Sequence, residues 1–124
     1  MQHLSGFAFY ATSFTDLSGR SLNFNKAAAG SDIFVMYMDT LGWHMTCGAD
    51  AGDIRLVVDG AALAANRAYG STAYGWYMMP FSFLWYFQGM SAGAHNVRLQ
   101  AVRYSCASDI LIGWSDNDVN NIFA

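Results

Sequence analysis

The sequence predicts an all-β protein, and three observations lead to this prediction. All nine acidic residues are Asp and only one Lys is present, so the best surface helix formers are almost absent. Aromatic residues, which favour strands, make up 16% of the chain. Turn signals rich in Gly, Asp and Asn recur at short intervals, which is typical of a sandwich or a barrel.

Short strands are expected between these turn signals along the whole chain. They cover residues 6–12, 20–25, 32–39, 42–47, 53–58, 73–79, 81–88, 95–104, 109–114 and 119–123. The segment AALAANRA, residues 61–68, fits either a helical turn or the far arm of a hairpin. No linker, repeat or low-complexity segment divides the chain, so residues 1–124 are expected to form one domain with its own core.

The clearest strand pattern lies in GMSAGAHNVRLQAVRYS, residues 89–105. A tight turn built on Gly93 precedes a strand whose residues alternate between two kinds of face. One face carries Val97, Leu99 and Ala101, and the other carries Asn96, Arg98 and Gln100. This alternation predicts a strand with one face in the core and the other in solvent.

Two other strands, SDIFVMYMD and PFSFLWYFQ, are apolar on both faces. A lone antiparallel sandwich normally has polar residues on its outer faces, so a second surface is expected to cover these strands. A ligand groove or a packed loop is the alternative cover. The sequence favours self-association through Phe34, Met36, Met38, Phe81, Phe83, Trp85 and Phe87.

Charge and hydropathy exclude several kinds of partner. The net charge is −3 at pH 7 and no basic run is present, which argues against nucleic-acid binding. The sequence has no uninterrupted apolar run of about 18 residues, so insertion into a membrane is not expected. We expect no secretion signal, because MQHLSGFAFYATS lacks a charged start and a continuous apolar segment. Cys47 and Cys106 fit either a disulfide or two buried thiols, so the redox compartment stays open.

The polar residues do not form a recognisable catalytic or metal-binding motif. His3, His44 and His95 are not at metal-ligand spacing, and His95 is expected to start a strand and cap its loop. No nucleophile elbow or Cys-His signature is present and Glu is absent, so we expect neither an enzyme nor a cofactor. The oxygen-rich segment SDNDVNN, residues 115–121, fits a Ca²⁺ loop less well than an ordinary Asx-rich turn.

Aromatic residues beside Gly-rich turns are the candidate binding residues. Loops carry binding sites more often than strands do, and exposed Trp and Tyr rings stack on sugars or anchor protein interfaces. The candidates for contact with a receptor or glycan are Tyr69, Tyr74, Trp76 and Tyr77.

Three segments together resemble a known group of domains. They are IRLVVDGAAL (54–63), with a hairpin at Asp59-Gly60, FSFLWYFQGMSAGAHNVRLQAV (81–102) and ILIGW (110–114). Their order resembles the trimeric jelly-roll heads related to tumour necrosis factor and complement-type globular domains, as found in phage fibres and bacterial collagen-like proteins. The resemblance implies an antiparallel jelly-roll sandwich that forms a homotrimer around a threefold axis. The final segment NIFA, 121–124, is shorter than the apolar strand that often ends these domains.

Composition and resemblance together predict a non-enzymatic structural and binding module. Its expected role is the trimeric head of a virion or cell-surface fibre that mediates assembly and attaches to a receptor or glycan. The expected partners are copies of itself, other virion or fibre proteins and a glycan receptor, at the virion or extracellular surface. The alternative is a monomeric carbohydrate-binding module with aromatic residues on one open face.

Overall fold

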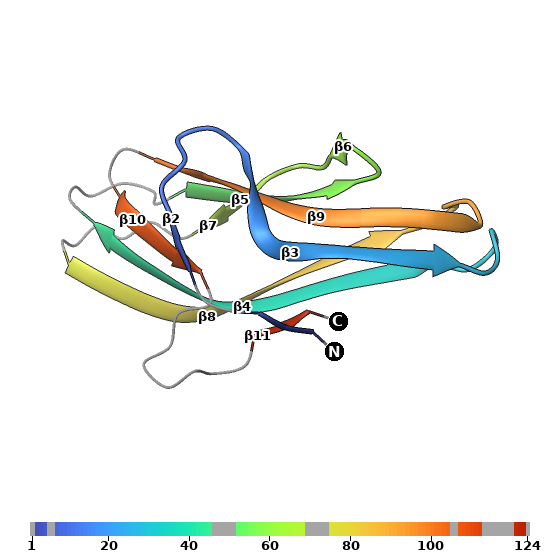
Figure 1. Cartoon of the computed structure of the whole chain (residues 1–124), viewed down its shortest axis with the longest axis horizontal. Helices are drawn as coiled ribbons and strands as arrows, with labels where there is room; N and C mark the ends of the chain where they lie inside the picture. The colour runs from blue at the N-terminus through green and yellow to red at the C-terminus, as the bar shows by residue number, and fades with distance from the viewer. Residues whose placement is uncertain are drawn as a thin grey trace.

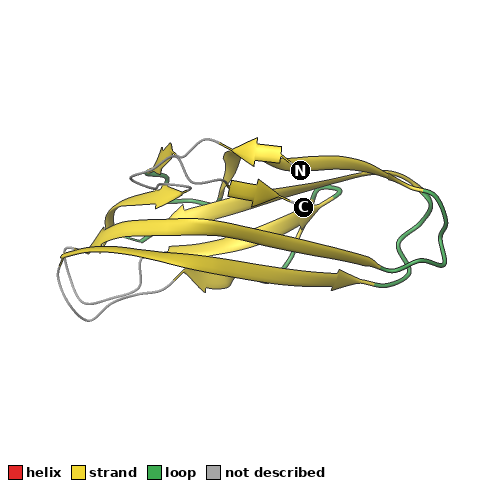
Figure 2. Cartoon of the chain, turned by 90° about the horizontal axis from the view of Figure 1, so that it is seen from below, coloured by secondary structure: helices red, strands yellow, loops and turns green. Residues whose placement is uncertain are grey.

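In a computed structural model of the chain, two antiparallel β-sheets pack face to face (Figure 1). The structure describes residues 2–4, 7–45, 52–68, 75–104, 107–112 and 121–123. All regular secondary structure in these residues is strand (Figure 2), and they include no helix that is long and apolar enough to cross a membrane.

The first sheet is built around one long strand, β4. Its strands are β1 (Gln2–Leu4), β2 (Phe7–Phe9), β4 (Ile33–Met45), β8 (Gly75–Phe87), β10 (Ala107–Ile112) and β11 (Asn121–Phe123). β8 pairs with all thirteen residues of β4 on one side, and β10 and β11 pair with it on the other. β2 and β1 then pair with β10 and β11. β8 is therefore an edge strand within the described part of the chain.

The second sheet has β9 near its centre. Its strands are β3 (Thr15–Lys26), β5 (Gly52–Val58), β6 (Ala61–Ala62), β7 (Asn66–Ala68) and β9 (Gly93–Arg103). The order is β3-β9-β5, and β6 and β7 both pair with the remaining edge of β5. If the short pieces β1 with β2, β6 with β7 and β10 with β11 each count as one interrupted strand, both sheets have four strands. Their order is then 1-8-3-6 and 2-7-4-5, which is that of a jelly roll. The predicted antiparallel β-sandwich is confirmed.

The core lies between the sheets and follows the alternation of the strand residues. In β9, Val97, Leu99 and Ala101 are fully buried while the residues between them lie on the outer face, which confirms the predicted pattern. The facing sheet contributes Val35 and Tyr37, and β5 contributes further apolar side chains. The hydrophobic effect of burying these side chains stabilises the contact between the two sheets.

A buried ion pair crosses this core and joins the two sheets. The Arg20 Nη2 of β3 lies 3.2 Å from the Asp39 Oδ2 of β4, and both side chains are buried. The same carboxylate accepts hydrogen bonds from the Tyr37 hydroxyl and, at 2.8 Å, from the backbone N–H of Thr40. Burial, reinforced by the Asp39 carboxylate, holds the pKa of Tyr37 well above its ordinary value, so this hydroxyl remains a donor.

Several predicted boundaries are wrong for local physical reasons. Residues 15–19 fall between two predicted strands but belong to β3, which is irregular there because Gly19 has a φ of 71° and the pairing with β9 shifts between Asp16 and Ser21. The breaks expected between the predicted strands, at residues 40–41 and at Pro80, are absent, since β4 and β8 run through them. Pro80 is tolerated because β8 is an edge strand. Residues 61–68 contain β6 and β7, so the hairpin interpretation is correct and the helical one is wrong.

The substitution Asp39→Ala is expected to lower the free energy of unfolding by about 3–5 kcal/mol, because it leaves the Arg20 guanidinium buried without its carboxylate. Urea denaturation measures this loss. Asp16→Ala is the control, because it removes the carboxylate of an exposed pair with Arg98 and should cost less than about 1 kcal/mol. Equal small losses for the two variants would contradict the assignment.

Candidate functional site

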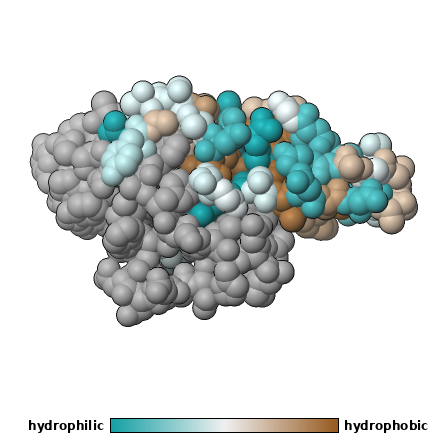
Figure 3. Space-filling view, viewed as in Figure 1, coloured by the Kyte–Doolittle hydropathy of each residue, from teal (hydrophilic) through white to brown (hydrophobic). Residues whose placement is uncertain are grey.

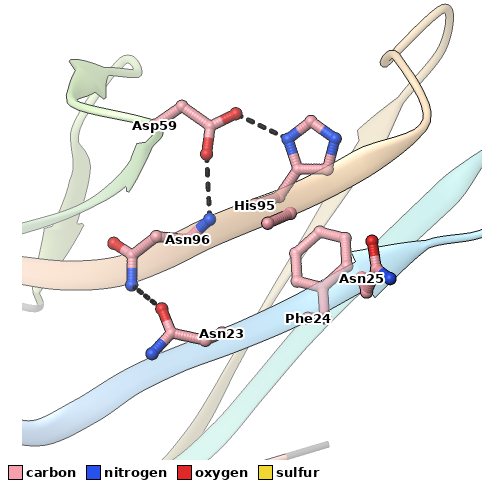
Figure 4. A pocket seen from close by; sticks show the side chains of 7 residues that line it. Asn23, Phe24, Asn25, Asp59, His95 and Asn96 are labelled. Carbon is pink, nitrogen blue, oxygen red and sulfur yellow. Dashed lines mark hydrogen bonds and ion pairs between the residues drawn. The ribbon is translucent and has the colours of Figure 1, made fainter.

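A shallow pocket of about 540 Å³ opens where β3, β9 and the turn between β5 and β6 meet (Figure 4). In the pairing of β3 with β9, Asn23 lies opposite Asn96 and Phe24 lies opposite His95. Three side-chain amides, one carboxylate, one imidazole and one aromatic ring therefore meet in a small area. The lining residues are Asn23, Phe24, Asn25, Asp59, Ala94, His95 and Asn96.

The tight turn between β5 and β6 places Asp59 at the pocket. Asp59 and Gly60 have φ angles of 48° and 87°, as a two-residue hairpin turn requires, which confirms the predicted Asp59-Gly60 hairpin. The Asp59 carboxylate accepts a 2.8 Å bond from the backbone N–H of Asn96, and the Asp59 N–H donates to the Asn96 carbonyl at 2.9 Å. The N–H of Asn96, followed by the His95 ring, lowers the pKa of Asp59.

His95 faces a hydrogen-bond acceptor at each ring nitrogen. Its Nδ1 lies 2.7 Å from the Asp59 Oδ2, and its Nε2 lies 2.9 Å from the Ser91 carbonyl oxygen. A carbonyl and an ionised carboxylate only accept, so the imidazolium, with an N–H on each nitrogen, satisfies both. Asp59 first and Ser91 second raise the pKa of His95. His95 is the third residue of β9, which begins at Gly93, and its contact with Ser91 confirms the expectation that it caps the preceding loop.

The asparagine side chains form the open part of the pocket. The Asn96 Nδ2 donates to the Asn23 Oδ1 at 2.7 Å, so these two amides hold each other in place. Asn25 is exposed, and its side-chain amide makes no hydrogen bond to other described residues. Phe24 is half-buried and packs against the core, with its ring centroid 5.5 Å from that of His95. The pocket therefore offers oriented amide donors and acceptors.

The polar surface continues from the pocket along β9. The hydrophilic residues over β3 and β9 are visible in Figure 3. The Asp16 Oδ1 accepts bonds from the Arg98 Nε at 3.0 Å and the Gln100 Nε2 at 2.8 Å. The Gln100 Oε1 in turn accepts a 2.9 Å bond from the Nε of Arg55, whose guanidinium lies 3.8 Å from the centroid of the Phe14 ring. This outer face is thus a connected polar surface.

The outer face of the opposite sheet is apolar where β4 and β8 pair. Phe34 is 66% exposed and Leu84 is 65% exposed. The rings of Phe34 and Tyr86 stack with their centroids 4.6 Å apart. We call this surface the β4–β8 face; its exposed large hydrophobic residues are Phe34, Met36, Met38, Leu84 and Tyr86.

The residues predicted for a self-association interface do not share one face of the sheet. Phe34, Met36 and Met38 lie on the outer β4–β8 face, as an interface requires. Phe83, Trp85 and Phe87 point the other way, since Trp85 is buried at 9% exposure and the two Phe rings pack against the core. The prediction that these three side chains join the interface is wrong, because the register with β4 turns Leu84 and Tyr86 outward instead. The Phe81 side chain is outside the described part.

Other predicted residues also fall outside the description. Tyr69 and Tyr74 lie outside the described residues, as do Cys47, Cys106 and 115–120. Trp76 and Tyr77 belong to β8, but their side chains are outside the described part. The residues that the structure describes contain no group of three or more His, Cys, Asp or Glu that could hold a metal ion.

The pocket asparagines were missed by the sequence interpretation. In SLNFNK, Asn23 and Asn25 alternate with larger side chains, which places both on one face of a strand. Asn is depleted in strands, so two of them at alternate positions are a signal that could have been noticed. Their proximity to Asp59 depends on the pairing of β3, β9 and β5 and has no local signal.

No protein-family model matches the chain, and no curated protein matches it. Among solved structures, the chain is similar to the EclA C-terminal domain, a sugar-binding protein, with a TM-score of 0.44 and 12% identity over 92% of this chain and 76% of that one. A family 35 carbohydrate-binding module from an environmental isolate has a TM-score of 0.31 and 15% identity, over 98% of this chain and 99% of that one. A structure of infectious bursal disease virus, Gx strain, has a TM-score of 0.26 and 9% identity, over 95% of this chain and 34% of that one. Because these TM-scores are below 0.5, the functional argument rests on the pocket itself.

Replacing His95 by Gln is expected to change thermal stability in a pH-dependent way. The raised pKa of His95 stabilises the fold fully below its ordinary value of 6.5, and this stabilisation is lost as the pH rises through the folded-state pKa. The lowered pKa of Asp59 stabilises the fold above its ordinary value of 3.8, and this stabilisation is lost as the pH falls through the folded-state pKa. The difference in Tm between the wild type and His95→Gln should therefore be largest between about pH 4 and 6.5.

Scanning calorimetry from pH 3 to 9 measures this difference, with Gln88→Ala, at an exposed position just after β8, as the control. A difference in Tm that stays constant across the whole range would show that the bonds of His95 do not depend on its charge.

Proposed function

We propose that the chain is a carbohydrate-binding module whose site is the pocket between β3, β9 and the β5–β6 turn. The observation that carries this proposal is the set of mutually oriented side chains of Asn23, Asn96, Asp59 and His95. Sugar hydroxyls donate and accept hydrogen bonds at once, as amide side chains do. A neutral saccharide matches this arrangement of amides.

The hydrogen bonds in the pocket favour binding over catalysis. Both ring nitrogens of His95 already have partners, and the Asp59 carboxylate is shared between His95 and the Asn96 N–H. Neither group is free to exchange a proton with a bound sugar, as a general acid or base must. The proposed module is therefore non-enzymatic. The EclA domain is described as sugar-binding and the family 35 module as carbohydrate-binding.

Asn25→Ala is expected to weaken saccharide binding roughly 3- to 10-fold, which corresponds to the loss of one hydrogen bond. The Asn25 amide is exposed and has no hydrogen bond to other described residues, so the fold should not change. The measurement is calorimetric titration with the neutral oligosaccharide that gives the strongest signal on a glycan microarray. Gln88→Ala removes an exposed side-chain amide just after β8, outside the pocket lining, and should bind as the wild type does. Binding by Asn25→Ala at wild-type affinity would contradict the site.

A second candidate function is assembly of several copies through the β4–β8 face. Five large exposed hydrophobic residues gather there, and monomeric proteins rarely leave such a patch uncovered. The trimeric head of a virion or extracellular fibre, with other fibre proteins as partners, would use this face. The pocket lies on the other sheet, so assembly would leave it open to a surface glycan.

Leu84→Lys tests the second candidate. Leu84 is exposed, so a Lys should be accepted by the folded chain but should prevent the β4–β8 face from being buried in an oligomer. Light scattering at several concentrations is expected to give an oligomer for the wild type and a monomer for Leu84→Lys. Ser21→Lys adds the same charge to an exposed position of β3 and should leave the mass unchanged. A monomeric wild type at every concentration would remove this candidate.

A further inference from the structure

Two buried cationic side chains hold the loops at one end of the sandwich. The loops that connect β3 to β4 and β8 to β9 lie side by side there (Figures 1 and 2). The Lys26 Nζ donates to carbonyl oxygens of both loops, at 3.0 Å to Ala29 and 2.8 Å to Met90. His95 joins Ser91 of the second loop to Asp59 of the β5–β6 turn. Three connections are thus tied together beside the pocket.

The bonds of His95 depend on its charge. Its side chain is only 7% exposed, so water has little access to replace a lost partner. The neutral imidazole has one N–H and one lone pair, and it cannot donate to Asp59 and Ser91 together. Deprotonation therefore breaks one of the two bonds, and the ring loses its contact with either the β5–β6 turn or the β8–β9 loop.

The charged groups around His95 act on its protonation in opposite directions. Asp59, from the β5–β6 turn, is the carboxylate that contacts the ring, and it favours the imidazolium. Lys26, from the end of β3, opposes it through its charge, but its ammonium group is bonded to loop carbonyls. Phe24, which packs beside the ring, is uncharged.

Loss of the bond to Asp59 would alter the pocket directly. Asp59 lines the pocket, and its second carboxylate oxygen holds the Asn96 N–H at 2.8 Å. Asn96 in turn orients Asn23 at 2.7 Å. The ring of His95 is therefore the first member of a chain of hydrogen bonds that runs through the polar lining.

We propose that the pocket keeps its binding geometry only while His95 is protonated, so that a neutral saccharide binds in mildly acidic or neutral solution and is released as the pH rises. This regulation rests on the proposed carbohydrate-binding function. A neutral ligand has no proton of its own to gain or lose in this range, so the pH dependence belongs to His95.

The experiment compares pH 5.5 with pH 8.5 in the full chain. NMR of the ¹⁵N-labelled ring should show both nitrogens of His95 protonated at pH 5.5 and one at pH 8.5. Calorimetric titration with the microarray-selected neutral oligosaccharide should show affinity about tenfold lower at pH 8.5, the cost of losing one charge-assisted hydrogen bond. His95→Gln should bind with the same affinity at both pH values.

Asp59→Asn supplies a conservative test. The introduced amide is able to accept from the Asn96 N–H and donate to the lone pair of a neutral His95, whose Nε2–H still reaches Ser91. The ratio of affinities at the two pH values should therefore approach one in this variant, whatever its affinity at pH 5.5. A merely structural role for Asp59 would not change this ratio.

The outcomes separate the two proposals. Equal wild-type affinity at both pH values, or a ring that is already neutral at pH 5.5, would overturn the regulation while leaving saccharide binding intact. If no saccharide binds, the proposed function fails. The ligand-free NMR titration then still decides whether the charge of His95 controls the geometry of the pocket. Amide signals of Gly60 and Asn96 should then shift with the same midpoint as the His95 ring, and signals that do not move would overturn the inference.

Discussion

The alternation of side chains along each strand is the constraint on which the structure depends. In β9 it sends Val97, Leu99 and Ala101 into the core and leaves the residues between them on the surface. Because β3 and β5 pair on either side of β9, their outward polar residues join the same surface. The core, the polar surface and the β4–β8 face are thus three consequences of one period-two pattern.

The pocket forms where this pattern meets the loops. Charged groups are few in this chain, and two of the buried ones, Lys26 and His95, hold loop carbonyls or the Asp59 turn instead of filling the core. A third, Arg20, pairs with Asp39 across the two sheets. Each of these buried charges thus has a positioning role, as its desolvation cost leads one to expect. The site is consequently a connected arrangement of hydrogen bonds at one end of the sandwich.

Much of the fold follows from local signals, whereas the site does not. The Asp59-Gly60 hairpin and the faces of β9 are predictable because turn chemistry and alternation act within a few residues. The outward face of β8 was assigned wrongly, because Phe83 and Trp85 are as apolar as Leu84 and Tyr86 and only the register with β4 distinguishes them. The contact of His95 with Asp59 joins residues 36 positions apart, so the pairing of β5 with β9 had to be known first.

Chemical-shift mapping of the ¹⁵N-labelled protein with neutral oligosaccharides at pH 6 would locate the bound sugar. The shifted amides should belong to residues 23–25, 59 and 94–96, around the pocket. Shifts confined to the β4–β8 face, around Phe34 and Leu84, or the absence of any shift across the whole panel, would contradict the proposed site.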